Sequence, residues 1–362
     1  MAFSSSRLSI ARRRRGLTKQ ALAAQAGVAY RSIVAYERSE TEPTEEATAK
    51  LARATTFPTA FFLRQELDSL PIDGVSFRSL ARMTAAQRDR ALAGGELALE
   101  LVDWIDERFA FDEPDVPDLR AYGTPEAAAR ALRVRWGLGD KPIPNMLWLL
   151  EAKGVRVFSL AEENVEVDAY SFWRGRQPLV FLNTMKSAEH SRFDAGHELG
   201  HLVLHQHGAA VGREAETQAN AFASAFLMPE SSITAHAPSP PLLSALIEAK
   251  HYWKVSVAAL AYRMHVVKML STWNYHSLCV EIQTRNYRTN EPEPEPREVS
   301  QVWPKVFAAL REEGTTHRDV ARQLDWPLEE LQALVFQLVV TKGGATRSTK
   351  ARTQLKKLHL TT

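Results

Sequence analysis

The sequence of 362 residues contains very little cysteine and no long hydrophobic segment. Its single cysteine, Cys279, excludes an intrachain disulfide and is typical of proteins that stay in a reducing compartment. No apolar run approaches the roughly 20 residues of a membrane-spanning helix, and no apolar signal core follows the N-terminal basic residues. We therefore expect a cytoplasmic protein of two or three domains that does not contact a membrane.

Acidic residues are absent before Glu37, whereas basic residues are frequent there. Such a basic surface attracts the phosphate backbone of nucleic acids. Thr18 is a natural N-cap for one helix, and Gly27 gives the backbone freedom that a tight turn needs. Residues 29–36 then predict a second helix with Ile33 pointing inward, so the whole pattern indicates a helix-turn-helix.

The stretch from Leu17 to Glu37 closely resembles the Cro/C1-type (XRE) helix-turn-helix regulators, and the resemblance extends over about residues 7–62. It implies an all-α DNA-binding domain, residues 1–65, whose second helix lies in the major groove. It also implies that Arg12 to Arg15 contact phosphates. A module that binds a protein, or only dimerises, is the alternative. The other positions implied to contact DNA are Lys19, Ala29, Tyr30, Arg31 and Val34.

Residues 66–119 are expected to connect this domain to the rest of the chain. Apolar residues recur at helical spacing from Ala85 to Glu107, which predicts a long amphipathic helix. The acidic segment from Asp112 to Asp118 contains two prolines and cannot donate all its backbone hydrogens to a helix. This segment is predicted to be a linker.

The central motif of the chain is His-Glu-x-x-His at residues 197–201. Positions i and i+4 of an α-helix lie on one face, so His197 and His201 can bind the same metal ion. Glu198 is turned by roughly 100° from His197, where a carboxylate can act as general base on water. With two imidazoles bound, a tetrahedral Zn²⁺ still needs a third protein ligand, and its fourth position stays open for water.

A predicted helix from Glu214 to Leu227 provides the best candidates for the third ligand. Glu216 would complete a site of two histidines and one glutamate. Asn220, four residues later on the same face, can hydrogen-bond a ligating imidazole. Glu214 lies about 200° away on this helix and is the weaker candidate.

Two further histidines follow the motif closely. His207 has the spacing of the third histidine of metzincins, but Leu204 stands where that motif requires a glycine turn, so His207 is the less favoured third ligand. His205 lies on the same flank as the ligands, where it can orient them or donate to an oxyanion. Packing at the helix end is an equal alternative for His205.

Three short segments before the motif have the pattern of strands, at residues 154–160, 167–173 and 178–182. A helix is expected to begin at Pro125 with Thr124 as its N-cap, and another spans Met146 to Ala152. A small sheet set against helices predicts an α+β domain. Its expected limits are residues 120–288.

The motif helix, the later Glu-x-x-Ala-Asn sequence and Leu-Met-Pro at residues 227–229 closely resemble the ImmA/IrrE metallopeptidase family, over about residues 120–285. The resemblance implies a zincin-like, gluzincin-type metallo-endopeptidase with Zn²⁺, or alternatively Mn²⁺, as cofactor. It implies His197, His201 and Glu216 as metal ligands. It implies Glu198 as general base. Members are linked to cleavage of Cro/C1-type repressors that control stress or mobile-element genes, which implies a repressor-type protein substrate.

The C-terminal part follows Glu291–Pro296, a segment of alternating glutamate and proline that is predicted to be a stiff, extended linker. Residues 297–341 show three helical patterns and predict a small helix-turn-helix-like bundle. Glu329 and Glu330 begin its last helix and disfavour phosphate contact, so dimerisation or protein contact is favoured over DNA binding. Residues 342–362 form a basic tail with expected non-specific DNA affinity.

Together these features predict a mostly α-helical, DNA-binding transcriptional regulator that carries a zinc metallo-endopeptidase domain. Its expected partners are DNA and a repressor-type protein substrate, and a homodimer is compatible with the pattern. The alternative is a transcription factor whose metal domain senses a ligand or a metal ion without hydrolysis.

Overall fold

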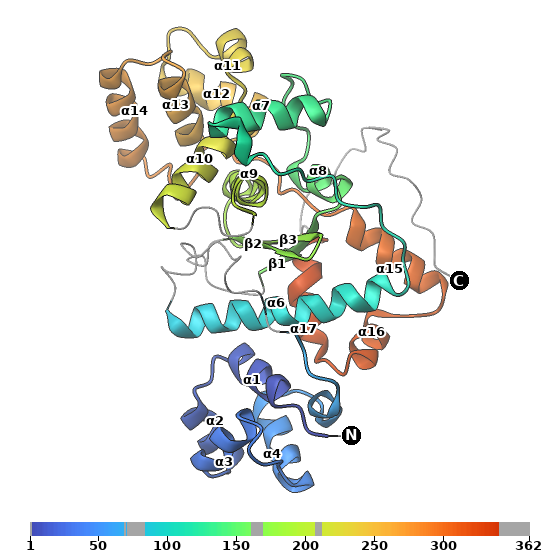
Figure 1. Cartoon of the computed structure of the whole chain (residues 1–362). Coiled ribbons are helices and arrows are strands. Elements are labelled where there is room, and N and C mark those ends of the chain that lie inside the picture. The colour runs from blue at the N-terminus through green and yellow to red at the C-terminus, as the bar shows by residue number, and fades with distance from the viewer. Residues whose placement is uncertain (1, 69, 71–83, 161–168, 207–211, 340–362) are drawn as a thin grey trace.

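The computed structural model describes residues 2–68, 70, 84–160, 169–206 and 212–339, so the predicted basic tail lies outside the described part of the chain. The described residues form sixteen α-helices and one three-stranded sheet. Helices α1 to α4 lie at one end of the molecule, α11 to α14 lie at the other, and the sheet lies between them (Figure 1). The predicted fold class is confirmed: mostly α, with an α+β central part, an all-α N-terminal domain and a small C-terminal helical bundle.

The N-terminal end forms the predicted helix-turn-helix. The Thr18 hydroxyl accepts a hydrogen bond from the Ala21 amide at the start of α2, and Gly27 ends this helix with a φ of 62°. Ile33 of α3 is fully buried beneath the turn. The sequence had not indicated α1, which supplies further core residues. The elements are α1 (Ser5–Arg14), α2 (Lys19–Ala26), α3 (Tyr30–Glu37), α4 (Glu45–Thr55) and the 3-10 helix η1 (Thr59–Leu63).

A long helix, α6 (Ala85–Asp106), separates this domain from the sheet, as its apolar periodicity predicted. Thr84 and Gln87 form a capping box at its start. It packs against α1 on one side, and on the other side the Tyr170 hydroxyl donates to the Ala91 carbonyl over 3.0 Å. Residues 110–119, which include the predicted acidic linker, have no regular secondary structure. They are nevertheless held to the domain by two backbone hydrogen bonds, from Asp115 to Lys153 and from Leu119 to Val203.

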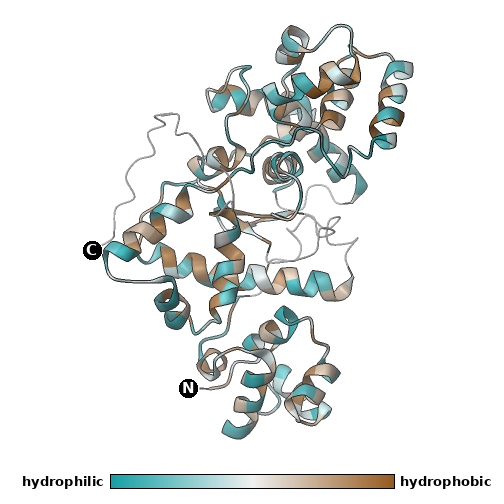
Figure 2. Ribbon diagram, turned by 180° about the vertical axis from the view of Figure 1, so that it is seen from behind, coloured by the Kyte–Doolittle hydropathy of each residue, from teal (hydrophilic) through white to brown (hydrophobic). Residues whose placement is uncertain are grey.

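The sheet has the strand order β1-β3-β2, with β1 parallel and β2 antiparallel to β3. Its strands appear as hydrophobic brown ribbons in Figure 2. Both faces are covered, because α9 packs on one face while α6 and α17 lie against the other (Figure 1). A sheet buried on both faces favours such continuous apolar strands. The strands are β1 (Arg156–Ser159), β2 (Tyr170–Arg174) and β3 (Gln177–Leu182).

Eight helices accompany the sheet in the central part of the described chain. As predicted, Thr124 caps α7 through the Ala127 amide and Pro125 occupies its first position. The sequence predicted the first four of these helices, α7 to α10. They are α7 (Pro125–Arg135), α8 (Met146–Ala152), α9 (Ala188–Leu204), α10 (Arg213–Leu227), α11 (Glu230–His236), α12 (Leu243–Trp253), α13 (Val257–Val266) and α14 (Thr272–Thr284).

The C-terminal bundle packs within the chain, between the sheet and the N-terminal domain. Thr316 begins its second helix with a capping box to Asp319. Beyond the last helix, the Gln337 amide oxygen accepts a hydrogen bond from the Ser159 hydroxyl of β1 over 2.9 Å. Helix α17 also packs against β1 and α6, so part of the bundle's surface is covered by the protein itself. Its elements are α15 (Val302–Glu312), α16 (His317–Gln323), α17 (Leu328–Val335) and the 3-10 helix η5 (Phe336–Leu338).

The predicted Glu-Pro linker has no regular secondary structure, but it is bound closely to the central helices. Glu298 accepts hydrogen bonds from the amides of Met146 and Leu147 at the start of α8, over 2.7 and 3.1 Å. The same carboxylate pairs with Arg192 of α9. We call residues 291–301 the strap, because they fasten α8, α9 and α12 together.

Glu151, at the end of α8, should make stability depend on pH. Burial raises its pKa to about 7, although the Ser300 hydroxyl and the amides of Gln301 and Val302 favour its charged form. A folded-state pKa above the unfolded value of 4.5 gives stability that is present at low pH and lost as pH rises towards 7. We expect the free energy of unfolding of the wild type to fall by about 2.5 kcal/mol between pH 5 and pH 8 because of this group. In Glu151→Gln this fall should be absent. Urea unfolding of both proteins at the two pH values measures this difference, and parallel pH dependences would refute it.

Arginines of the N-terminal domain form ion pairs with acids far along the chain. Arg14 and Arg15 both bind Glu330 of α17, over 2.8 and 2.6 Å, and Arg12 binds Glu37 of α3. The resemblance implied that Arg12 to Arg15 contact DNA phosphates; in the structure all four arginines pair with carboxylates of the protein itself. Arg13 pairs with α6, and Arg14 and Arg15 pair with α17, whereas the partner of Arg12 belongs to the helix-turn-helix domain itself. Other pairs across this boundary are Arg7–Glu100, Arg13–Glu96, Arg64–Glu100, Arg64–Asp325 and Arg15–Glu329.

Among the described residues, no helix has both the length and the apolar composition needed to cross a lipid bilayer.

Candidate metal centre

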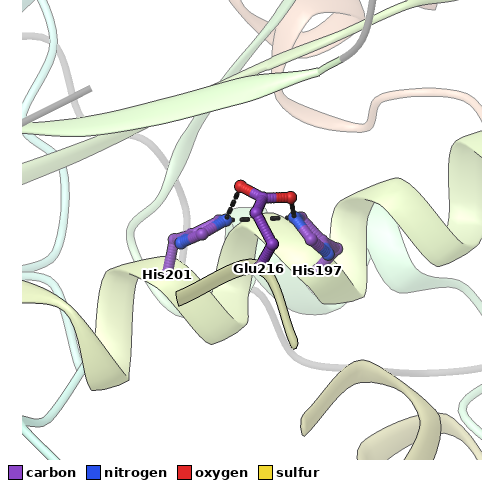
Figure 3. Close-up of side chains that lie close together, drawn as sticks. All are labelled: His197, His201 and Glu216. Atoms are coloured by element: carbon purple, nitrogen blue, oxygen red, sulfur yellow. Dashed lines mark hydrogen bonds and ion pairs between the residues drawn. The ribbon is translucent and has the colours of Figure 1, made fainter. Parts of the chain in front are cut away.

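His197, His201 and Glu216 converge on one point (Figure 3). The Nε2 atoms of the two histidines are 3.0 Å apart. The Glu216 carboxylate lies across them, with Oε2 3.4 Å from His197 Nε2 and Oε1 3.3 Å from His201 Nε2. The two histidines come from successive turns of α9, and Glu216 comes from the first turn of α10.

The close packing of α9 and α10 brings the three side chains together. Gly200 lies at their contact, where an added Cβ would be 3.2 Å from the Ala219 backbone and 3.1 Å from the Phe222 ring. Glycine therefore allows α10 to approach close enough for Glu216 to reach the histidines. Gly196 has more room, since its nearest neighbours would be 3.5 Å away from a Cβ, so alanine would fit there.

The arrangement fits a divalent metal ion. Two ligand atoms at 2.0–2.1 Å from a tetrahedral Zn²⁺ are about 3.3 Å apart. The three separations in the cluster, 3.0, 3.3 and 3.4 Å, are close to this value. Two imidazoles and one carboxylate also leave one tetrahedral position for water or substrate.

The outer nitrogens of both histidines have hydrogen-bond partners. His197 Nδ1 is 3.0 Å from the Asn220 amide oxygen, and His201 Nδ1 is 2.9 Å from His205 Nδ1. When Nε2 binds a metal, Nδ1 carries the hydrogen and donates it to these acceptors. His205 then donates from Nε2 to the Gln218 amide oxygen over 2.9 Å. These contacts fix the orientation of both imidazoles.

Burial and the neighbouring carboxylates shift the pKa values in the cluster in opposite directions. Burial disfavours protonation of His197, but the carboxylates of Glu216 and Glu198 outweigh it and raise its pKa to about 9. Burial lowers the pKa of His201 to about 4. Burial also disfavours the charged form of Glu216, yet hydrogen bonds with both histidines hold its pKa well below the usual range. Glu216 is therefore ionised at neutral pH, which is the form in which a carboxylate binds a metal ion.

Glu198 lies beside the cluster and is only 1% exposed. The Ser171 hydroxyl of β2 donates to its Oε2 atom over 2.7 Å. Burial raises the pKa of Glu198 to about 7. A carboxyl group with a pKa near neutrality can both accept and return a proton, which is what general acid–base catalysis requires.

Two family comparisons match separate parts of the chain. Residues 8–62 match the helix-turn-helix family, and residues 150–265 match the IrrE N-terminal-like domain of the M78 peptidases. The chain joins a helix-turn-helix domain to an IrrE-like domain. Both resemblances that the motifs indicated are thereby confirmed. No curated protein matches the chain.

Within the IrrE-like domain, the structure separates the candidates for the third ligand. Glu216 belongs to the cluster of metal-ligating atoms, and Glu214 does not. The Glu214 carboxylate instead accepts a hydrogen bond from the Gln218 amide over 3.3 Å. His207 lies outside the described residues. Asn220 and His205 both lie where the sequence suggested contacts with the ligating imidazoles.

Sequence reasoning missed three residues of this site. Ser171 contacts Glu198 from a strand, Gln218 contacts His205, and Gly200 sets the distance between two helices. Gly200 alone carried a signal, because a glycine inside a helix usually has a packing reason. The other two depend on contacts between elements that no spacing rule predicts.

The residues implied to contact DNA gather on the outer side of the helix-turn-helix domain, where α2 and α3 face away from α6 (Figure 1). Ala29 and Arg31 are exposed, Tyr30 is 53% exposed, and Val34 is half-buried. Lys19 is also half-buried and pairs with Glu37 over 3.0 Å. The exposed set therefore presents the Arg31 guanidinium, which forms no ion pair within the described part of the chain, and the Tyr30 ring.

Proposed function

We propose that this protein is a DNA-binding regulator whose IrrE-like domain is a zinc metallo-endopeptidase that cleaves a repressor-type protein. The observation that carries the proposal is the convergence of His197, His201 and Glu216 beside the buried carboxylate of Glu198. This is the ligand set and the base that peptide hydrolysis needs. Mn²⁺ is the alternative cofactor, since nitrogen and oxygen ligands also accept it.

Each residue has a defined role in this proposal. His197, His201 and Glu216 bind the metal, which supplies Lewis-acid activation when bound. Glu198 accepts a proton from the attacking water and returns it to the leaving amine. Asn220 and His205 accept hydrogen bonds from the outer nitrogens of the two ligating histidines and keep the rings oriented.

The helix-turn-helix domain would bring this chemistry to DNA or to DNA-bound proteins. The proposed substrate class is a Cro/C1-type repressor. The metal site is suited to hydrolysis of a peptide bond, and the helix-turn-helix domain is suited to binding operator DNA, where such repressors bind. Arg31 is the main candidate for base recognition, since arginine can bind guanine through two hydrogen bonds. A homodimer would match the two-fold symmetry of many operators.

The decisive experiment for this function uses candidate Cro/C1-type repressors encoded near the gene. Each repressor is incubated with the full-length protein, with and without a metal chelator. Cleavage that the chelator abolishes and added Zn²⁺ restores supports the peptidase. Binding of DNA that responds to metal, together with no cleavage of any candidate, would instead favour the non-hydrolytic sensor.

Arg31→Ala is expected to weaken specific DNA binding. Loss of a bidentate contact to a base costs about 1–3 kcal/mol and relaxes specificity at one position, while non-specific binding changes little. Mobility shifts with genomic fragments at several salt concentrations measure this. Arg53→Ala, at an exposed position of α4, is the matched control and should leave specific binding unchanged. Equal affinity of wild type and Arg31→Ala would remove Arg31 from the reading surface.

A further inference from the structure

A cavity lies beside α10, apart from the proposed metal ligands. It is bordered by α7, α10, α11 and α13 and has a volume of about 560 Å³. This is within the roughly 300–1,000 Å³ of small-molecule sites. These helices lie together at the end of the molecule away from the helix-turn-helix domain (Figure 1).

The cavity is on the far side of α10 from the metal centre. Ala225 lines it and follows Glu216 by nine residues on the same helix. Nine residues correspond to about 900° of rotation, which is a half turn beyond two full turns, and to about 14 Å along the axis. Ala225 and Glu216 therefore face opposite ways, and the cavity is a separate site.

Charged side chains of both signs line this cavity. Three are arginines and three are carboxylates, and among the described residues none of them forms an ion pair with another. Three of the six are exposed to solvent, and two of the arginines are buried. The six residues are Glu126, Arg130, Arg133, Asp140, Glu230 and Arg263.

Arg263 is the residue on which the argument mainly rests, because its side chain lines the cavity and is only 3% exposed. Its Nε donates to the Met228 carbonyl over 2.8 Å, which leaves the two terminal nitrogens without a hydrogen-bond acceptor in the described chain. Burial lowers its pKa, and the carboxylates of Glu126 and Glu230 are close enough to oppose this effect. A buried guanidinium thus faces the cavity with two carboxylates nearby.

We propose that this cavity binds a zwitterion, namely a free α-amino acid or a short peptide. The ligand carboxylate would bind Arg263 and Arg130, and its ammonium group would lie between Glu126 and Glu230. A simple anion would be repelled by the carboxylates, and a simple cation by the arginines. The remaining volume is bordered by Val134, Ala225 and Ala235, which suit an apolar side chain.

Calorimetric titration of the full-length protein with each of the twenty common amino acids, and with dipeptides built from them, tests this proposal. At least one of these compounds should bind. Its amide, which lacks the carboxylate, and its N-acetyl form, which lacks the ammonium group, should each bind at least tenfold more weakly. A preference for dipeptides would identify a peptide as the ligand. No binding at millimolar concentration, or equal binding of the blocked forms, would overturn the proposal.

Two variants connect the binding to this cavity. Glu230→Gln and Arg130→Gln change exposed side chains, and each should weaken binding about tenfold through loss of a charged hydrogen bond. Glu312→Gln, at an exposed position of α15, is the control and should bind like wild type. Unchanged affinity in both cavity variants would place the ligand elsewhere and refute the site. Both measurements are independent of peptidase activity.

Discussion

Glu198→Gln should lower the rate of substrate cleavage by about 10²–10⁴-fold while the protein still binds its metal ion. The amide has nearly the same shape as the carboxylate, but it cannot accept a proton from water. It can still accept the hydrogen bond from Ser171, so the local packing should remain. The proposed metal ligands are three other residues and are unchanged by this substitution.

The measurement is the initial rate of cleavage of the repressor substrate, together with metal content per chain. Glu248→Gln is the matched control, because Glu248 is exposed on α12. The same substitution there should change neither the cleavage rate nor the metal content. Cleavage by Glu198→Gln at the wild-type rate would show that Glu198 is not the general base. Loss of metal together with activity would instead assign Glu198 a structural role.

Lys250→Met should destabilise the protein by about 3–5 kcal/mol. The Lys250 side chain is fully buried, with Nζ 3.2 Å from Glu189 and 3.4 Å from Glu291. The same Nζ donates to the Glu293 carbonyl over 3.0 Å. Without the ammonium group, two buried carboxylates face each other unpaired. The strap would then lose the link that Lys250 makes between it and Glu189 at the start of α9.

Urea unfolding compares this variant with Lys268→Met, which removes an exposed lysine and should change stability by less than about 0.5 kcal/mol. Adding Glu189→Gln to Lys250→Met should recover part of the loss, since it removes one of the unpaired charges. An unfolding free energy of Lys250→Met equal to that of wild type would refute the role given to this buried cluster.

The metal centre was largely predictable from sequence because its geometry is local. The spacing of His197 and His201 fixes one face of one helix, and the spacing of Glu216 and Asn220 fixes one face of the next. The chemistry of zinc then indicates that these two faces meet. The helix-turn-helix was predictable for the same reason, from Thr18 and Gly27 at the two ends of α2.

Contacts between distant segments could not be predicted in this way. A run of four arginines looks like a phosphate-binding surface as long as the positions of Glu96 and Glu330 are unknown. The strap resembled a free linker because alternating glutamate and proline excludes a helix, but this composition does not reveal the amides that Glu298 binds. The limits of the segments 1–65, 66–119, 120–288, 297–341 and 342–362 as domains remain a proposal.

The most direct test of the account is the metal content of the purified protein, measured by elemental analysis for wild type and for Glu216→Gln. We expect about one zinc or manganese ion per wild-type chain, and at least tenfold weaker metal retention in Glu216→Gln, because one of three protein ligands has lost its charge. Equal metal content in the two proteins, or no bound metal in wild type supplied with Zn²⁺ and Mn²⁺, would contradict the assignment of His197, His201 and Glu216 as the metal centre.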